Sequence, residues 1–391
     1  MPPTSDPGSS GFALWNLGFR PFYLLAGFFA ALSVLGWAAQ FVTWTGVHVY
    51  GGDPRWHAHE MIFGFAFAVI VGFLFTAGSN WTGRATPTGM ALAAIAALWI
   101  AARAAVFASL LLVAAAADAA FAIAAAVGLG IPLAAARNRR NYFFIALLLA
   151  LGAAGLAFKL GMAGAIAFPA QRGLQTALDL ILFVICVMGG RVIPMFTANA
   201  IPGTKPVRLL WLERTALASV LVLLAGDVLN LAPVAIAAIA GAAAIAHAAR
   251  LALWKPWVTT ANPILWILHL SYAWIPVHLA LRTLTAVEML PLTLANHALA
   301  VGAAGGLIIG MMTRTSRGHT GRVLRASRIE TLCYVLVHLA AAVRVFLPLA
   351  VPELQLAAIA ISGILWSVAF GAFTVAYWPI LTRARVDGKP G

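Results

Sequence analysis

The chain has 391 residues, of which 63% are apolar and only 9% are charged. Soluble domains carry about 25% charged residues, so this composition excludes an ordinary soluble globular protein. The 25 Lys and Arg residues outnumber the 11 Asp and Glu residues, but the positive charges lie in alternate loops between apolar runs, which accounts for them without a nucleic-acid partner.

Apolar runs of membrane-spanning length recur from one end of the chain to the other, and no alternating barrel pattern is present. We therefore predict an all-α polytopic membrane bundle that forms one integral membrane domain over residues 1–391, with a flexible polar segment at residues 1–18. About twelve spans are expected. The first six, within residues 21–196, are 21–44, 59–79, 88–108, 110–135, 142–163 and 173–196. The second six, within residues 209–380, are 209–230, 233–254, 263–284, 291–313, 329–349 and 354–380.

The loop charges predict the orientation of the chain. Basic residues follow the even-numbered spans, as with Arg137, Arg139 and Arg140 after the fourth span and the run of arginines after the tenth. The opposite loops carry little positive charge. By the positive-inside rule, both termini are predicted to be cytoplasmic, which puts the start of the second span at the outer face.

The start of the second span carries the most informative motif, Trp56-His57-Ala58-His59-Glu60. Ionisable groups at membrane depth are costly, so they usually mark a site or a pathway. If the helix already begins at His57, then His57 and Glu60 share a face and His59 lies about 200° away from His57. If His57 remains in extended chain, the two imidazoles can converge. The sequence leaves both arrangements open.

A further histidine, His297, lies in the outer third of the tenth span. Gly302, Gly306 and Gly310 form a stripe of small residues on the opposite side of that helix, and such a stripe lets a neighbouring backbone approach closely. One face is then expected to pack against protein while the other presents an imidazole. We predict that His57, His59 and His297 form a metal cluster near the outer face; the alternative for His297 is a hydrogen bond to a neighbouring helix.

The remaining intramembrane histidines divide by position. His269 lies nearer the cytoplasmic side of the ninth span and is the next candidate ligand, either to a deeper haem or as a residue that supports a ligand. His278 faces the opposite side of the same helix, so one centre is not expected to use both. We expect His338 to pack or to hydrogen-bond, and His247 to extend from a cytoplasmic helix end toward the membrane surface.

Several charges are buried by this assignment of spans: Arg103, Lys159, Asp179, Arg191, Asp227 and Arg344. Each needs a counter-charge or carbonyl groups. Guanidinium groups suit bidentate carboxylates such as haem propionates, which makes Arg191 and Arg344 candidate cofactor-binding residues; mutual Arg–Asp pairing is the alternative. Glu60 and Asp118 are candidate proton carriers.

Several motifs together resemble the NnrS family, which comprises haem- and copper-containing membrane proteins associated with nitric oxide metabolism in denitrifying and nitrosatively stressed bacteria. The matching segments are residues 18–22 (Gly-Phe-Arg-Pro-Phe), 56–61, 189–197, 268–276, 296–302 and 312–322. They occur in order from the first span to the eleventh. The residues carried over are His57, His59, Glu60, Arg191, His269, His297, Arg314 and His319.

The resemblance implies haem b and copper as cofactors, held by His57, His59, His269 and His297, with Arg191 and Arg314 beside them and Glu60 as the catalytic proton donor. It implies a bacterial inner membrane protein that takes nitric oxide as ligand or substrate, with a quinol or a cytochrome as electron donor. An oxidoreductase of the nitric oxide reductase type is the first hypothesis. A secondary transporter or exporter of a nitrosylated species is the alternative, and a sensor or assembly factor without turnover is the third.

Overall fold

The computed structural model describes residues 11–42 and 53–389, and these residues form a bundle of long helices. The first half contains α1 (Phe19–Phe41), α2 (Pro54–His59), α3 (Phe67–Thr82), α4 (Gly89–Phe107), α5 (Leu111–Ala135), α6 (Phe143–Met162) and α7 (Ala170–Ala200). The second half contains α8 (Leu210–Leu229), α9 (Pro233–Leu253), α10 (Pro263–Ala286), α11 (Leu292–His297), α12 (Gly306–His319), α13 (Arg328–Ala350) and α14 (Gln355–Thr382).

Eleven stretches of the described chain are long and apolar enough to cross a membrane. Helix α8 corresponds to the remaining predicted span; it has 20 residues, but Glu213, Arg214 and Asp227 give it more charge than an isolated span tolerates. It packs against α7 and α9, and two of these charges have protein partners: Glu213 pairs with Arg250 of α9, and Asp227 pairs with Arg282 of α10. The prediction of an all-α polytopic bundle is confirmed, and the predicted spans fall on the observed helices within a few residues. Residues 43 and 44 of the first predicted span lie outside the described residues.

Two of the long helices contain a π-helical turn directly after a histidine. Helix α2 ends at His59 and continues through the π-helical residues Glu60–Ala66 into α3. Helix α11 ends at His297 and continues through the π-helical residues Ala298–Gly305 into α12. Because a π-helical turn adds a residue to the helix, it changes which side chains face inward, and such turns occur frequently at functional sites.

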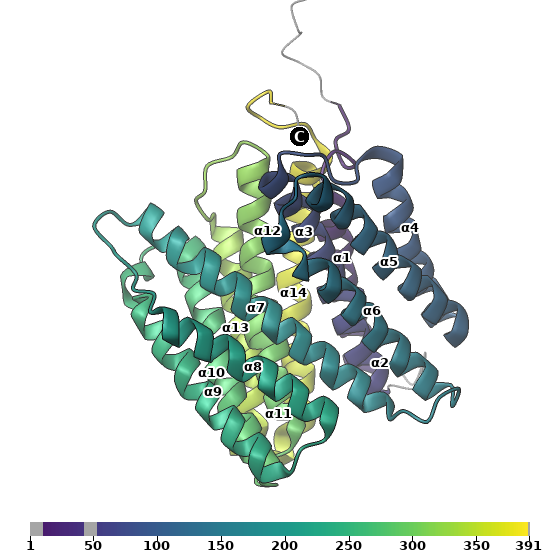
Figure 1. The fold of residues 1–391 in the computed structure, drawn as a ribbon, viewed down its shortest axis with the longest axis vertical. Coiled ribbons are helices and arrows are strands. Elements are labelled where there is room, and N and C mark those ends of the chain that lie inside the picture. The colour runs from purple at the N-terminus through teal and green to yellow at the C-terminus, as the bar shows by residue number, and fades with distance from the viewer. Residues whose placement is uncertain (1–10, 43–52, 390–391) are drawn as a thin grey trace, which may run out of the picture.

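Both ends of the described chain lie at the same end of the bundle, which we name the termini face (Figure 1). The backbone N–H of Ala13 donates to the carbonyl of Thr382 at 2.8 Å. The fully buried Arg20 donates from Nη1 to the carbonyls of Leu381, at 2.9 Å, and Arg383, at 2.8 Å. Arg20 therefore satisfies the last carbonyls of α14, and part of the polar segment expected to be flexible is held against the end of that helix. Residues 1–10 lie outside the described residues.

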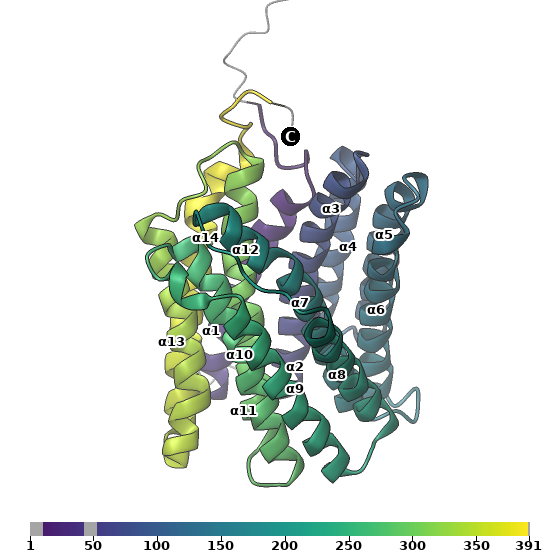
Figure 2. The same cartoon turned by 60° about the vertical axis from the view of Figure 1, so that its left-hand side comes forward.

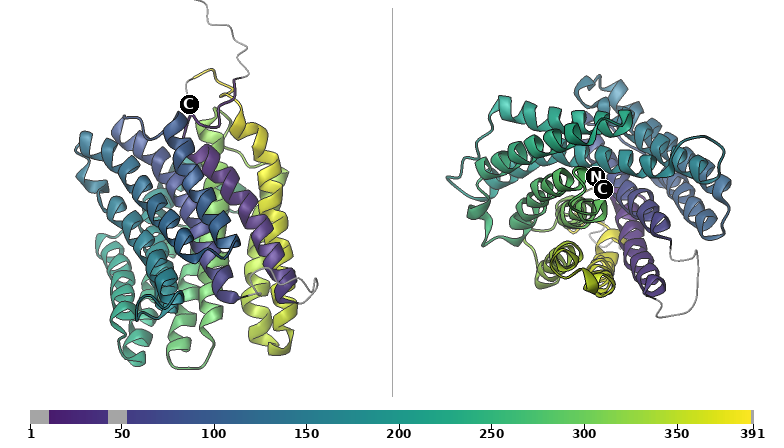
Figure 3. Two further views of the ribbon diagram at one scale, coloured as in Figure 1. Left: turned by 90° about the vertical axis from the view of Figure 1, so that its right-hand side faces the viewer. Right: turned by 90° about the horizontal axis from the view of Figure 1, so that it is seen from below.

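The two halves of the chain lie side by side around the bundle axis (Figures 2 and 3). Helices α10 and α12 approach closely where glycines replace larger residues. A Cβ atom on Gly302 would lie 2.3 Å from the Trp274 ring, and one on Gly306 would lie 2.3 Å from the Ser271 hydroxyl. The glycine stripe thus packs against α10, as predicted.

Candidate functional site

Helix α2 begins before His57 because Asp53 and Pro54 start it. The Asp53 carboxylate accepts a hydrogen bond from the backbone N–H of Arg55 at 2.7 Å, and Pro54 occupies the first helical position, both favourable at a helix N-terminus. Partial burial raises the pKa of Asp53, but the hydrogen bonds from Arg55 outweigh it and hold that pKa below its ordinary value. His57 is therefore helical, so the extended alternative does not occur.

The imidazoles of His57 and His297 lie nearly parallel, 10° apart, with ring centroids separated by 6.4 Å. Trp37 from α1 stacks on the His57 ring at 4.1 Å. The Nδ1–H of His297 donates to the carbonyl of Thr293 at 2.6 Å, which leaves its Nε2 lone pair free. The Nδ1 of His57 is buried without a hydrogen-bond partner. Two rings from sequence positions far apart thus meet at the end of the bundle opposite the termini face.

Beside this pair lies the guanidinium group of Arg344, on α13. Its side chain is buried, with 8% of the residue exposed, and it makes no ion pair or hydrogen bond with the residues that the structure describes. Its positive charge acts on both His57 and His297. A buried cation needs a counter-charge, so this arrangement suits an anionic group bound beside the two rings.

His59 points away from this pair and enters a closed ring of charged groups. Its Nδ1–H donates to Glu60 Oε1 at 2.6 Å, and Lys159 Nζ donates to its Nε2 at 2.7 Å. Lys159 also donates to Asp118. Arg103 closes the ring, because its Nη2 donates to Asp118 at 2.7 Å and its Nε lies 3.0 Å from Glu60 Oε2. We name these five residues the charge ring.

The charge ring balances its own charge, because two carboxylates face two cations around a neutral imidazole. All five members are buried. Both nitrogens of His59 are committed to partners in the ring, so neither offers a lone pair to a metal ion. The ring also requires Gly64, since a Cβ atom there would lie 3.2 Å from Arg103 Nη1 and 2.5 Å from the Phe29 ring.

The structure therefore brings together two of the three histidines predicted as an outer metal cluster. His57 and His297 face each other, whereas His59 turns toward α5 and α6. Within residues 11–42 and 53–389, no group of three or more His, Cys, Asp and Glu side chains is arranged to hold a metal ion. Glu60 joins His59 in the charge ring rather than lying beside His57.

The hydrogen bonds assign the protons of the histidines on α10. Thr197 donates its hydroxyl proton to the carbonyl of Ile193 at 2.9 Å, so His269 Nε2, 2.8 Å from that hydroxyl, must be the donor to it. The Nδ1 of His269 is then left with a buried lone pair and no partner. His278 donates from Nδ1 to the carbonyl of Ala295 at 2.7 Å, and its Nε2 is likewise buried without a partner.

His338 and His247 differ from these because their hydrogen bonds occupy both ring nitrogens. His338 Nδ1 accepts from Trp274 Nε1 at 3.1 Å, which confirms the expected hydrogen-bonding role. His247 is fully buried and bonds to Tyr272 and to the carbonyl of Ala216. The prediction that His247 extends to the membrane surface is wrong, because Tyr272 and the backbone of α8 supply its partners inside the bundle.

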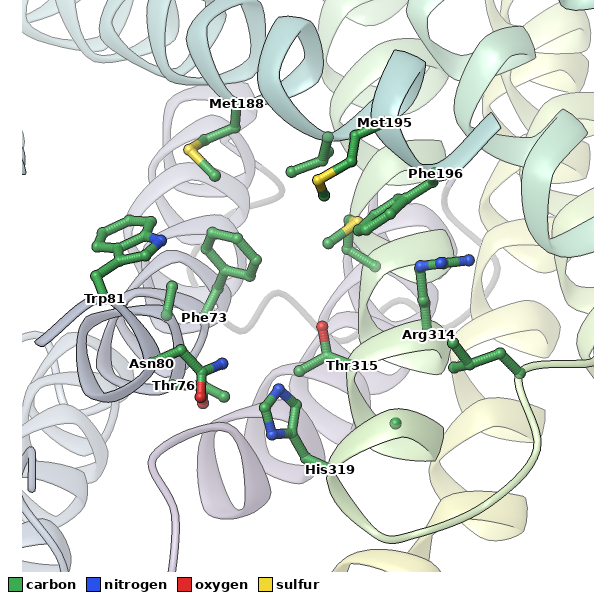
Figure 4. Close-up of a pocket in the computed structure, with 15 residues that line it drawn as sticks. Phe73, Thr76, Asn80, Trp81, Met188, Met195, Phe196, Arg314, Thr315 and His319 are labelled. Atoms are coloured by element: carbon green, nitrogen blue, oxygen red, sulfur yellow. The ribbon is translucent and has the colours of Figure 1, made fainter. Parts of the chain in front are cut away.

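The predicted cofactor-binding arginines have three different environments. Arg191 donates to the side-chain oxygen of Asn141 at 3.0 Å and lies over the rings of Phe143 and Phe144. Arg314 lies over the Phe196 ring, 3.7 Å from its centroid, and faces a cavity at the termini face (Figure 4). Only Arg344 lies beside a pair of histidines. Arg103 and Arg282 pair instead with Asp118 and Asp227, the alternative that the sequence left open.

A family model described as NnrS protein matches residues 13–385 of this chain. The chain belongs to the NnrS family. This family is associated with nitric oxide metabolism, and the helical bundle agrees with a multi-pass membrane protein. No curated protein sequence matches the chain.

Sequence reasoning missed two features of this NnrS protein. It did not pair Lys159 with His59, because the two residues lie 100 positions apart; the signal available was that both were buried ionisable groups. It also ranked His278 below His269, although the structure gives each of them one buried and unpartnered nitrogen.

Proposed function

We propose that this chain is a haem- and copper-dependent membrane protein of the bacterial inner membrane that consumes nitric oxide and so protects against nitrosative stress. The observation that supports this most strongly is the His57–His297 pair beside the guanidinium of Arg344, which has no counter-charge among the residues that the structure describes. Imidazole is a favoured ligand of copper and of haem iron. Because the family is associated with nitric oxide metabolism, nitric oxide is the ligand that we propose for this metal centre.

The His57–His297 pair brings two imidazoles close enough to share a metal ion; because the rings lie stacked, a ring must turn for its in-plane nitrogen to point at that ion. Two imidazoles on opposite sides of one metal ion, with metal–nitrogen bonds of about 2 Å, have ring centroids roughly 6 Å apart, close to the 6.4 Å observed. The hydrogen bond from His297 to Thr293 fixes the ring orientation and leaves Nε2 free, as ligating histidines commonly require. Arg344 would balance an anion bound beside the metal ion.

His269 fits a second, deeper site, because its Nδ1 lone pair is buried and has no partner. His269 would hold haem b there, and the His57–His297 pair would hold copper. Thr197 holds the His269 ring in place by accepting its Nε2–H. Arg191 and Arg314, both near the termini face, are the candidate partners of cofactor carboxylates on that side.

The bound metals would supply an electron-rich centre that binds nitric oxide and reduces it. The chain itself would supply access and protons. Nitric oxide is small and apolar, so it can reach the site from lipid without a polar channel. Glu60 is the proposed proton donor; it accepts a hydrogen bond from His59, which in turn accepts one from Lys159. That chain of hydrogen bonds connects the carboxyl group to a second proton-bearing side chain.

Metal content of histidine variants tests the proposal. The full chain, produced with haem and copper supplied, is purified in detergent and its haem and copper are measured per chain. His57→Gln and His297→Gln are expected to lose copper, and His269→Gln to lose haem. The matched control is His338→Gln, a buried histidine that already has both nitrogens hydrogen-bonded; it is expected to retain both metals.

Nitric oxide consumption by the same preparations tests the reaction. In detergent no closed compartment exists, so a saturable loss of nitric oxide at an electrode indicates consumption, whereas a transporter or a sensor without turnover would show none. The proposal is contradicted if protein produced with haem and copper supplied shows no haem absorption band and contains no copper.

A further inference from the structure

A cavity of about 340 Å³ lies at the termini face, between helices α3, α7 and α12 (Figure 4). The cavity-lining residues recur along one face of each helix, as in the α7 series Met188, Val192 and Met195. Inward-facing stripes of this kind normally interdigitate to fill a core. Here the stripes of α3, α7 and α12 leave room for a ligand between them.

The cavity wall is apolar and its polar groups gather near the helix ends. Phe73, Trp81 and Phe196 contribute rings, and methionines contribute thioethers. Such walls suit a flat ring, because aromatic faces and polarisable sulfur both pack well against one. This lining therefore favours a planar, largely apolar ligand.

Three polar side chains of the lining have no hydrogen-bond partner among the described residues. They are the imidazole of His319, the amide of Asn80 and the guanidinium of Arg314, and the close-up shows them around the cavity (Figure 4). No carboxylate of the described residues lines the cavity. A cationic ligand would therefore meet only a like charge, whereas a neutral ring with hydroxyl or carbonyl oxygens would meet donors and an imidazole acceptor.

The rim of the cavity is partly exposed. Met195 and Leu324 line it and are 48% and 44% exposed. His319 is the last residue of α12, and Asn80 lies two residues before the end of α3. The polar end of the cavity is thus near a membrane boundary, with an apolar edge beside it. This is the geometry expected for an amphiphile whose ring enters the protein while its tail stays in lipid.

We propose that this cavity binds the ring of a membrane quinol. One quinol hydroxyl donates to the His319 imidazole, and the other oxygen accepts from the Asn80 amide. The role of this site rests on the proposed consumption of nitric oxide. One quinol and two nitric oxide molecules give one quinone, one nitrous oxide and one water, because the quinol supplies both electrons and both protons that the reduction requires.

Direct binding to the full chain is the first test. Wild-type protein in lipid nanodiscs is titrated with decylubiquinone in the absence of nitric oxide, and bound quinone is measured after rapid separation. One saturable site per chain is expected. Absence of saturable binding overturns the proposal.

Substitutions that fill the cavity test whether the quinone binds there. Met195→Trp puts an indole at the mouth of the cavity and is expected to weaken binding at least about tenfold. The matched control is Met90→Trp, since Met90 is also an exposed methionine, 86% exposed, but does not line the cavity; it is expected to bind like wild type. His319→Leu should weaken binding and His319→Gln should restore part of it. Equal affinity in Met195→Trp and wild type would contradict the location.

A comparison of two electron donors distinguishes a failure of the quinol site from a failure of the proposed nitric oxide consumption. Nitric oxide loss is measured with decylubiquinol and, in parallel, with a phenazine kept reduced by ascorbate. Loss with the phenazine but not with the quinol overturns the quinol site and leaves nitric oxide consumption standing. Saturable quinone binding without nitric oxide loss under either donor leaves the site standing and overturns the consumption.

Discussion

Charge balance in the charge ring gives the sharpest energetic prediction. Lys159→Met removes one cation and leaves Glu60 and Asp118 to share Arg103. A buried charge that loses its partner costs about 3–5 kcal/mol, so the free energy of unfolding should fall by that amount. Asp118→Asn alone leaves an unpaired cation and should cost a similar amount. The double variant restores neutrality and should lose only about 2 kcal/mol, the worth of its missing hydrogen bonds.

The double-mutant cycle is measured by detergent denaturation followed by circular dichroism. From these values a coupling energy of about 4 kcal/mol or more is expected between the two positions. Lys205→Met, at an exposed loop lysine, serves as the control and should change stability by less than about 0.5 kcal/mol. A coupling energy near zero would mean that water, not the ring, compensates these charges, and the account of His59 as a neutral member of a closed ring would fail.

Three further predictions concern the glycine contact between α10 and α12, the start of α2 and the buried guanidinium of Arg344. Gly306→Ala should destabilise the protein by about 1–3 kcal/mol because of the Ser271 contact, whereas Gly36→Ala, with open space around it, should not; the same denaturation assay compares them. Asp53→Ala should cost about 1 kcal/mol at neutral pH. Because the Asp53 pKa lies below its ordinary value, this difference should persist down to about pH 4 and disappear as the pH falls through the folded-state pKa. Arg344→Gln should reduce haem or copper per chain, while the exposed Arg325→Gln should not.

The sequence predicts the helices well because the rule that governs them is local. About 20 consecutive apolar residues are enough to indicate a span, so most predicted boundaries fall within a few residues of the observed ones. The sequence also predicts α8 as a span, over residues 209–230, but not how its charges are satisfied: Glu213 pairs with Arg250 of α9 and Asp227 with Arg282 of α10. Its place in the bundle depends on tertiary contacts, which no single stretch of sequence encodes.

The candidate site is predicted less well because its chemistry depends on individual nitrogen atoms. The motif around His57 and His59 marks both residues, but only the structure shows that Lys159 and Glu60 occupy the nitrogens of His59. Likewise, the free lone pair of His269 follows from a hydroxyl proton on Thr197. The π-helical turns after His59 and His297 have no sequence signature that helical periodicity would reveal, yet they set the direction of the side chains that follow.

The quinol cavity and the His57–His297 pair lie far apart, so electron transfer between them requires an intermediate redox group, which we place at His269. His297 and His319 lie on one continuous helical stretch, Leu292–His319, and are separated by 22 positions and therefore by about 30 Å along its axis. Electrons released by a quinol at the termini face could not reach the His57–His297 pair over that distance in one step. His269 lies on α10, which packs against α12, and it enters the bundle from the termini face while the pair lies at the opposite end. A haem held by its free nitrogen would divide the path into two shorter steps. His269→Gln should therefore abolish quinol-dependent nitric oxide loss while leaving copper at the pair, and unchanged quinol-dependent loss in that variant would refute this order of sites.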